Sequence, residues 1–144
     1  MFEIDLLKGK TIIITGGGTG LGKSMAVRFA ELGANLVLTS RRQDVLDETS
    51  AEIKQATGAK ILTVAADIRS PEQVADMVAQ SVSRFKKIDG LLNNAAGNFI
   101  SPTEKLSENA FKTIVDIVLL GSFNCTLNAG REMIKSGGGN ILSI

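Results

Sequence analysis

Short apolar runs alternate with longer amphipathic segments along the 144 residues of the chain. Such runs are typical of strands buried on both faces of a parallel sheet, and such segments are typical of the helices that cover it. The apolar runs predict strands over residues 10–15, 35–40, 60–66, 89–95 and 139–144. The segments between them predict helices over about 20–32, 43–56, 71–86 and 107–135. Because crossovers between parallel strands are right-handed, the pattern predicts a single-domain, doubly wound α/β sheet.

The clearest helix start is the sequence SPEQ at residues 70–73. Ser70 offers a side-chain oxygen to the N-terminus of a helix, and Pro71 suits the first helical position, where no N–H is needed. Gln73 stands where a side chain can close a capping box back onto Ser70. We therefore expect the third helix to begin here.

The fourth predicted helix carries more apolar residues than one core-facing stripe needs. Either the helix packs deeply in the molecule, or part of it forms a subunit interface. The pattern leaves both alternatives open. The apolar residues are Phe111, Ile114, Val115, Ile117, Val118, Leu119, Leu120 and Phe123.

The overall composition narrows the classes of function. The net charge is +1 with both signs spread along the chain, so no basic surface for nucleic acid is indicated. Cys125 is the only cysteine and histidine is absent, which excludes an internal disulfide and the usual Cys/His zinc sites. The first ten residues show no signal or transit pattern, and no apolar run approaches the length of a membrane span. We expect a cytoplasmic protein with neither nucleic acid nor a membrane as partner.

A glycine-rich segment, TIIITGGGTGLGKS at residues 11–24, joins the first predicted strand to the first predicted helix. At such a turn, free backbone N–H groups and the positive end of the helix dipole point at one spot, which suits a phosphate. Glycine lets the backbone approach a pyrophosphate closely. The context favours a dinucleotide-phosphate site over a plain flexible loop. The residues of this site are Thr15, Gly16, Gly18, Thr19, Gly20, Leu21 and Gly22.

The same segment also matches the pattern of a nucleoside-triphosphate loop. Residues 17–24 spell G-x-x-x-x-G-K-S, with Lys23 and Ser24 at the last two positions. The sequence match alone does not exclude a nucleoside-triphosphate site, but the motifs further along the chain favour a dinucleotide.

The residues that follow the second and third predicted strands bear on the choice of dinucleotide. An NAD site usually has Asp or Glu after the second strand to bind the ribose 2′-hydroxyl, whereas Arg accommodates a 2′-phosphate. This chain has Ser40, Arg41 and Arg42 there, which favours NADPH over a pair of merely solvated arginines. Asp67 and Ile68 follow the third strand, where a carboxylate either accepts a hydrogen bond from the adenine amino group or caps a turn.

Two motifs resemble those of the short-chain dehydrogenase/reductase family. The first is T-G-x-x-x-G-x-G at residues 15–22, and the second is NNAAGNF at residues 93–99. The second motif, continued by ISPTEKLS, looks like the 2,4-dienoyl-CoA reductase branch, which reduces conjugated fatty acyl-CoA thioesters with NADPH. The resemblance covers residues 11–144 and departs from the common family motif at Ala96, where glycine is usual.

The resemblance implies roles for individual residues. It implies that Asp67 contacts adenine, and that the chain lies along the nicotinamide ribose at Asn94, Ala95, Ala96 and Gly97. It implies that Asn98 donates a hydrogen bond to the thioester carbonyl oxygen as this oxygen gains negative charge. The implied contacts to a fatty acyl-CoA are Arg41, Arg69, Phe99 and Ser107. Without the resemblance, Asn98 would be interpreted as a turn residue and Phe99 as a core residue. Ser107 would be interpreted as a helix N-cap and Arg69 as a solvated side chain.

The family's proton chemistry uses a tyrosine with a lysine a few residues later, and this chain has no tyrosine. Residues 137–144, GGGNILSI, resemble the approach to the strand before that pair. We therefore expect residues 1–144 to be the NADP-binding, Rossmann-type part of a longer reductase, truncated after the fifth strand, inactive by itself and homo-oligomeric through the fourth helix. The alternatives are a 3-oxoacyl or enoyl thioester reductase of the same family, and a non-catalytic module that binds a dinucleotide or a partner subunit.

Overall fold

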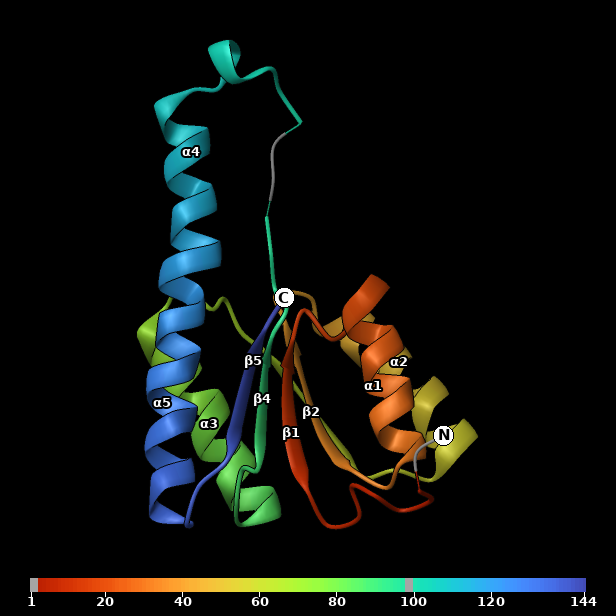
Figure 1. Cartoon of the computed structure of the whole chain (residues 1–144). Coiled ribbons are helices and arrows are strands. Elements are labelled where there is room, and N and C mark those ends of the chain that lie inside the picture. The colour runs from red at the N-terminus through yellow and green to blue at the C-terminus, as the bar shows by residue number, and fades with distance from the viewer. Residues whose placement is uncertain (1–2, 98–99) are drawn as a thin grey trace.

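The computed structural model describes residues 3–97 and 100–144 and is built around one parallel sheet (Figure 1). The strands lie in the order β3-β2-β1-β4-β5. Together with the helices between them, they confirm the predicted doubly wound α/β fold. The strand bounds are β1 Thr11–Thr15, β2 Asn35–Ser40, β3 Ile61–Ala65, β4 Gly90–Asn93 and β5 Asn140–Ser143.

β1 lies at the centre of the sheet, where the strand order reverses. Ile14 of β1 pairs with Leu38 of β2 on one side and with Leu92 of β4 on the other. From β1 the chain proceeds outward through β2 and β3, and then crosses back to β4 and β5. In open parallel sheets, ligands bind beyond the carboxyl ends of the strands at such a reversal.

Helices cover both faces of the sheet, so that the structure has three layers (Figure 1). α1 and α2 pack on one face, and α3 and α5 pack on the other. Because successive side chains of a strand point to opposite faces, β1 contributes Ile14 to the first core and Ile13 to the second. The helix bounds are α1 Gly20–Glu31, α2 Gln43–Thr57, α3 Pro71–Phe85 and α5 Ser122–Lys135.

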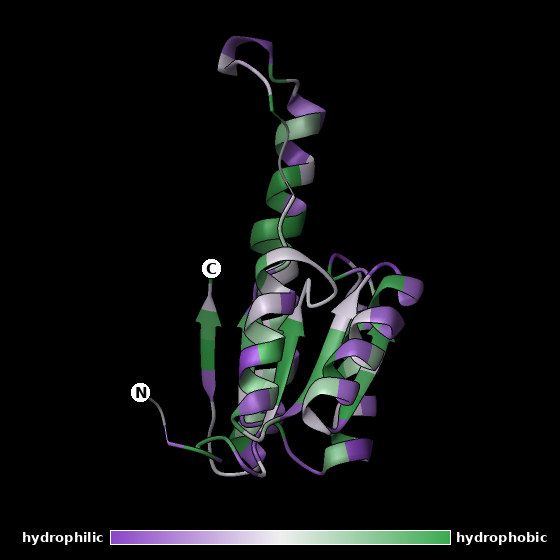
Figure 2. Ribbon diagram, turned by 90° about the vertical axis from the view of Figure 1, so that its right-hand side faces the viewer, coloured by the Kyte–Doolittle hydropathy of each residue, from purple (hydrophilic) through white to green (hydrophobic). Residues whose placement is uncertain are grey.

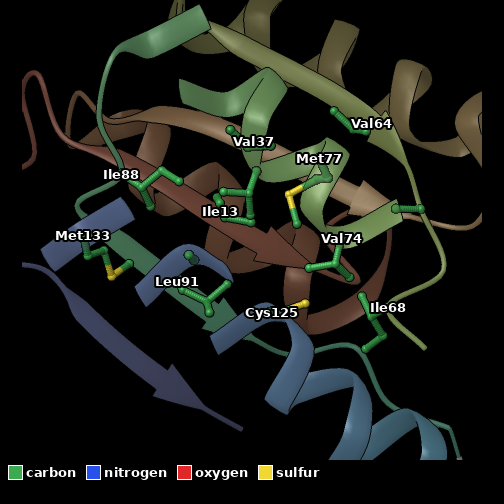
Figure 3. Close-up of a cluster of buried hydrophobic side chains, with 13 residues drawn as sticks. Ile13, Val37, Val64, Ile68, Val74, Met77, Ile88, Leu91, Cys125 and Met133 are labelled. Atoms are coloured by element: carbon green, nitrogen blue, oxygen red, sulfur yellow. The ribbon is translucent and has the colours of Figure 1, made fainter. Parts of the chain in front are cut away.

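The second core joins three elements that are far apart in the sequence (Figure 3). Ile13 of β1 lies among Met77 of α3 and Cys125 and Met133 of α5, and all four side chains are almost completely buried. Burial raises the pKa of the Cys125 thiol to about 12, so the thiol stays protonated at neutral pH.

The predicted fourth helix, residues 107–135, is one continuous helical run with an irregular middle. After a short 3-10 turn, η1 Thr103–Lys105, it comprises α4 Glu108–Val115, the π-helical η2 Asp116–Gly121, and α5. α5 packs on the sheet and buries Cys125, whereas α4 buries no residue and stands clear of the sheet (Figure 1). Deep packing therefore applies only to the last part of the helix.

Residues 108–135 are also long and apolar enough to cross a membrane, judged by length and composition alone. This differs from the expectation, drawn from the sequence, that no apolar stretch approaches that length. The core helix of a soluble protein meets the same criterion, and α5 contacts both α3 and β4. The criterion by itself is thus weak evidence for a membrane span.

Two apolar surfaces are exposed in the part of the chain that the structure describes (Figure 2). One is on the long helix, and the other is on β5 at the edge of the sheet. On the helix the exposed side chains are Phe111, Val118, Leu119, Leu120, Phe123, Leu127 and Ile134. At the edge they are Ile141, Leu142 and Ile144.

The predicted start of α3 is confirmed, but its capping box is not closed. Ser70 Oγ accepts a hydrogen bond from the Gln73 backbone N–H at 3.3 Å, with Pro71 at the first helical position. The Ser70 N–H donates instead to the Asp67 carbonyl at 2.9 Å, so it has no need of Gln73. Gln73 Oε1 accepts from the Asp67 N–H at 2.8 Å and so holds the loop that precedes the helix.

Candidate functional site

A cavity of about 460 Å³ opens beyond the carboxyl ends of the central strands, at the reversal of strand order. The turn after β1 contributes Gly16 and Thr19, and the first residues of α1 contribute Gly20, Leu21 and Gly22. The end of β2 and the residue after it contribute Thr39, Ser40 and Arg41. The segment after β3 contributes Ala66, Asp67, Ile68 and Arg69. The segment after β4 contributes Asn94, Ala95 and Ala96, and the long helix contributes Ile117.

The turn between β1 and α1 has the geometry of a phosphate site. Gly16 has a φ of +66°, which favours glycine. A Cβ on Gly22 would collide with the Gly16 carbonyl and lie 2.6 Å from Asn94 Nδ2, so only glycine fits there. No side chain caps α1 at its N-cap residue, Thr19. The first N–H groups of α1 and its dipole therefore face the cavity, as an anion requires.

Thr15 and Gly18, which the sequence predicts to contact the cofactor, are not among the residues that line the cavity. Thr15 Oγ1 donates to the Leu92 carbonyl at 3.3 Å and accepts from the N–H groups of Asn94 and Ala95, each at 2.9 Å. The Gly18 carbonyl accepts from Thr49 Oγ1 of α2 at 2.7 Å. The Thr15 hydroxyl thus joins β1 to β4, and the Gly18 carbonyl joins the turn to α2.

Lys23 and Ser24, which complete the likeness to a triphosphate loop, have their polar side-chain atoms engaged outside the cavity. Lys23 Nζ pairs with Glu52 Oε2 of α2 at 2.5 Å, and Ser24 Oγ donates to the Gly20 carbonyl at 3.2 Å. Neither residue lines the cavity. The geometry therefore favours the dinucleotide over the nucleoside triphosphate.

The two asparagines after β4 tie the site together in different directions. Asn94 Nδ2 donates to the carbonyls of Thr15 and Gly16, at 3.0 and 3.4 Å, and so joins β4 to the phosphate turn. Asn93 Nδ2 donates to Thr126 Oγ1 of α5 at 3.0 Å. Gly97 approaches the long helix so closely that a Cβ there would lie 2.7 Å from Ile117 Cδ1. These contacts place Ala95 and Ala96 along the cavity floor.

The structure separates the two arginines that were predicted to bind a 2′-phosphate. Arg41 lines the cavity, next to Ser40. Arg42 is exposed and forks onto Asp44, with Nε 3.3 Å from Oδ1 and Nη2 2.6 Å from Oδ2. Because Arg42 is committed to Asp44 outside the cavity, Arg41 is the better candidate for binding an anion there.

Asp67 and Arg69 form an ion pair in the wall of the cavity. Arg69 Nε lies 2.9 and 3.0 Å from the two carboxylate oxygens of Asp67, Arg69 Nη2 also contacts Oδ2, and the Arg69 N–H donates to Oδ1 at 3.0 Å. These hydrogen bonds lower the pKa of the Asp67 carboxyl against the opposing effect of burial, and the charge of Arg41 adds to the lowering. Asp67 is therefore an ionised hydrogen-bond acceptor at neutral pH.

Of the described residues predicted to contact the substrate, only Arg41 and Arg69 are found at the cavity. Asn98 and Phe99 lie outside the described residues. Ser107 does not line the cavity; its Oγ accepts from the Ala110 N–H at 3.1 Å and caps α4. Arg69 does lie at the cavity, on the side of Asp67. Among the described residues, no group of three or more His, Cys, Asp or Glu is placed to hold a metal ion.

Sequence reasoning missed Ile117 and Thr39 as cavity residues. Ile117 belongs to the π-helical segment, and nothing in the local apolar pattern distinguishes it from its neighbours. Thr39 is fully buried, and its Oγ1 has no hydrogen-bond partner among the described residues. The position of Thr39 one residue before Ser40, at the end of a buried strand, was the signal that could have found it.

Comparison with known proteins gives a consistent family. The family model described as short chain dehydrogenase matches residues 10–144. A Caenorhabditis elegans protein named probable 2,4-dienoyl-CoA reductase 3 is 46% identical over 140 residues, which cover 96% of this chain and 45% of that protein. The chain thus spans about half the length of the curated relatives that it matches.

Solved structures with the same fold include a dehydrogenase and a reductase. The citronellol catabolism dehydrogenase of Pseudomonas aeruginosa superposes with a TM-score of 0.92 at 35% identity, over 99% of this chain and 58% of that one. L-Sorbose reductase from Gluconobacter frateurii, solved with NADPH and L-sorbose, superposes with a TM-score of 0.89 at 29% identity, over 95% of this chain and 52% of that one.

Proposed function

The chain belongs to the short-chain dehydrogenase family, and we propose from this that it is the cofactor-binding part of an NADPH-dependent reductase of unsaturated fatty acyl-CoA. The cavity and its phosphate turn support the dinucleotide, and the name of the Caenorhabditis elegans relative supports the substrate class. The nicotinamide cofactor supplies a hydride when bound. The residues of this chain bind and orient the two ligands.

The residues around the cavity suit the parts of NADPH. The first N–H groups of α1 would hold the pyrophosphate, and Asp67 would accept a hydrogen bond from the adenine amino group. Arg41 carries the choice of NADPH, because it lines the cavity after β2, where an NAD site has an acid. The segment of Asn94, Ala95 and Ala96 would lie along the nicotinamide ribose.

The cofactor choice is tested by the dissociation constants of NADPH and NADH, measured by titration. Wild type should prefer NADPH, and Arg41→Ala should weaken NADPH by about tenfold or more while leaving NADH nearly unchanged. Arg42→Ala is the matched control, since Arg42 pairs with Asp44 outside the cavity. Equal affinities of wild type for the two cofactors would contradict the proposal.

For the substrate, we propose that Asn98 donates a hydrogen bond to the thioester carbonyl oxygen and that Arg69 binds a CoA phosphate. In a full-length reductase that contains this chain, Asn98→Ala should lower kcat by about a hundredfold without changing NADPH affinity. Asn109→Ala, at an exposed position of α4, is the control. An unchanged kcat in Asn98→Ala would count against this role.

A non-catalytic, dinucleotide-binding module is the second candidate, because the chain contains no tyrosine for the family's proton chemistry. The coding sequence beyond residue 144 separates the two candidates. A downstream Tyr-x-x-x-Lys supports the reductase, and a stop codon supports the module. A 3-oxoacyl or enoyl thioester reductase is disfavoured by the motif NNAAGNF at residues 93–99.

We also propose that the exposed apolar surface of residues 108–135 joins copies of this chain. The support is the set of exposed apolar side chains on that surface, which includes Phe111, Leu119 and Phe123. Sedimentation analysis should show an oligomer that Leu119→Lys dissociates. A monomeric wild type would refute this assembly.

A further inference from the structure

We propose that Asn124 is a positioning residue of the cofactor cavity: from α5 it holds the loop that presents Asp67. The inference rests on the proposed function, in which Asp67 binds the adenine end of the cofactor. Asn124 does not line the cavity itself. It acts on the cavity through the backbone of Ile68, the residue after Asp67.

The contact between Asn124 and the loop is direct. Asn124 Nδ2 donates to the Ile68 carbonyl oxygen at 2.9 Å, across 56 residues of sequence. Ile68 is 6% exposed and lies between Asp67 and Arg69, and all three residues line the cavity. The hydrogen bond therefore fixes the middle of the segment that forms the adenine side of the cavity.

A second contact holds the same helix against the same loop. Gly121 lies three residues before Asn124, on the same side of the helix. A Cβ on Gly121 would lie 2.5 Å from Ile68 Cδ1, so the helix approaches the loop as closely as it does because this residue is glycine. The Ile68 side chain and the Ile68 carbonyl are thus both in contact with the long helix.

The loop is held from its other side by α3. Gln73 Oε1 accepts from the Asp67 N–H at 2.8 Å, and the Asp67 side chain is oriented by Arg69. With Asn124 removed, the Ile68 carbonyl loses its side-chain partner while the contact to Gln73 remains. The loop would then shift about that remaining contact and carry the Asp67 carboxylate out of register with the adenine amino group.

The test compares Asn124→Ala with Asn128→Ala, one helical turn later. Asn128 Nδ2 donates to the Asn124 carbonyl oxygen at 2.9 Å, so the control removes a similar hydrogen bond on the same helix without touching the loop. The probes are NADPH and adenosine 2′,5′-bisphosphate, which carries only the adenine half. Asn124→Ala should weaken both probes by about fivefold, and Asn128→Ala should leave both nearly unchanged.

A double-mutant cycle shows whether Asn124 acts through Asp67. In an Asp67→Ala background, Asn124→Ala should cost no further affinity for adenosine 2′,5′-bisphosphate. The isosteric Asn124→Asp should weaken binding at least as much as Asn124→Ala, because it replaces the donor by an acceptor that faces the Ile68 carbonyl oxygen. Urea unfolding of each variant verifies that it is folded under the binding conditions.

Three results would overturn the inference. The first is unchanged binding in Asn124→Ala and Asn124→Asp, and the second is the same loss with and without Asp67. The third is an equal loss in Asn128→Ala, which would indicate a general effect on the helix. If wild type binds NADPH and depends on Arg41 while any of these occurs, only the inference fails. If wild type does not bind NADPH, the proposed function fails with it.

Discussion

β1 and β5 are both apolar strands of the same parallel sheet, but β1 is buried and β5 is exposed to solvent. In β1, Ile13 and Ile14 are completely buried, because strands flank β1 on both sides and helices cover both faces. In β5, Leu142 is 56% exposed, because β4 is the only neighbouring strand among the described residues (Figure 2). An apolar run therefore indicates a strand, but the neighbours of the strand decide how much free energy its burial contributes.

The same contrast separates the two ends of the long helix. α5 packs Cys125 and Met133 into the core beside Met77. α4 buries none of its residues and stands clear of the sheet (Figure 1). Of the two ends of the long helix, the one that packs on the sheet also reaches the segment after β4 that lines the cavity, through the hydrogen bond from Asn93 to Thr126.

The largest expected effect is the loss of stability when an apolar side chain of β1, rather than one of β5, is truncated. Ile14→Ala should lower the free energy of unfolding by about 2–5 kcal/mol, because it leaves a cavity in a closed core. Leu142→Ala should lower it by less than about 1 kcal/mol, because the side chain is already largely in water. Urea unfolding of both variants measures the difference. Losses of equal size would show that another chain covers β5 in solution.

The second prediction compares two helical glycines. Gly22→Ala should destabilise the protein by about 1–3 kcal/mol, because the new Cβ meets the Gly16 carbonyl. Gly130→Ala in α5 should stabilise it by up to about 1 kcal/mol, because alanine favours a helix and the nearest atom, Ile141 Cδ1, is 4.0 Å away. Thermal unfolding reports both signs. A stabilising Gly22→Ala would mean that the turn opens easily.

The third prediction concerns acid stability at the amino end of β1. Asp89 accepts hydrogen bonds from the Thr11 N–H at 2.9 Å and from Lys87 at 3.0 Å. Burial raises the pKa of Asp89, but these hydrogen bonds outweigh burial, and the net pKa is lowered. A lowered pKa in the folded state means that the unfolded state binds the proton more tightly, so stability is present above about pH 4 and is lost as pH falls further.

Asp89→Asn should therefore cost about 1 kcal/mol at pH 7, and its difference from wild type should shrink below about pH 4. Unfolding curves recorded from pH 7 to pH 3 measure this. Asp44→Asn is the control at pH 7, because its pair with Arg42 is exposed and contributes little. A difference that stays constant with pH would exclude the ionised carboxylate as the cause.

The fourth prediction concerns the reactivity of the Cys125 thiol, which should be very low in the folded protein. Because burial raises the pKa of Cys125 to about 12, iodoacetamide should hardly label the native protein at pH 8 and should label it readily in urea. Phe123→Cys, two residues earlier on the exposed face of α5, provides a native-state reference that should react quickly. Rapid labelling of native Cys125 would indicate that α5 detaches from the sheet.

Local patterns predicted the elements, because a buried strand or an amphipathic helix is recorded in its own residues. The start of α3 at Ser70 and Pro71 is an example. The π-helical segment at 116–121 was not predictable in this way, since its residues favour an ordinary helix as well. The candidate site was predicted where a backbone requirement selects the residue type, as at Gly16 and Gly22.

The sequence alone determined the strand-turn-helix at the phosphate site, the basic residues after β2 and the likeness to the family, because each depends on residues close together in the chain. Only the tertiary structure decided that Arg41 lines the cavity while Arg42 pairs with Asp44, that the Thr15 side chain joins β1 to β4, and that Asn124 reaches Ile68. The physical reason is that hydrogen-bond partners and burial depend on neighbours brought together by the fold, and local spacing does not record them.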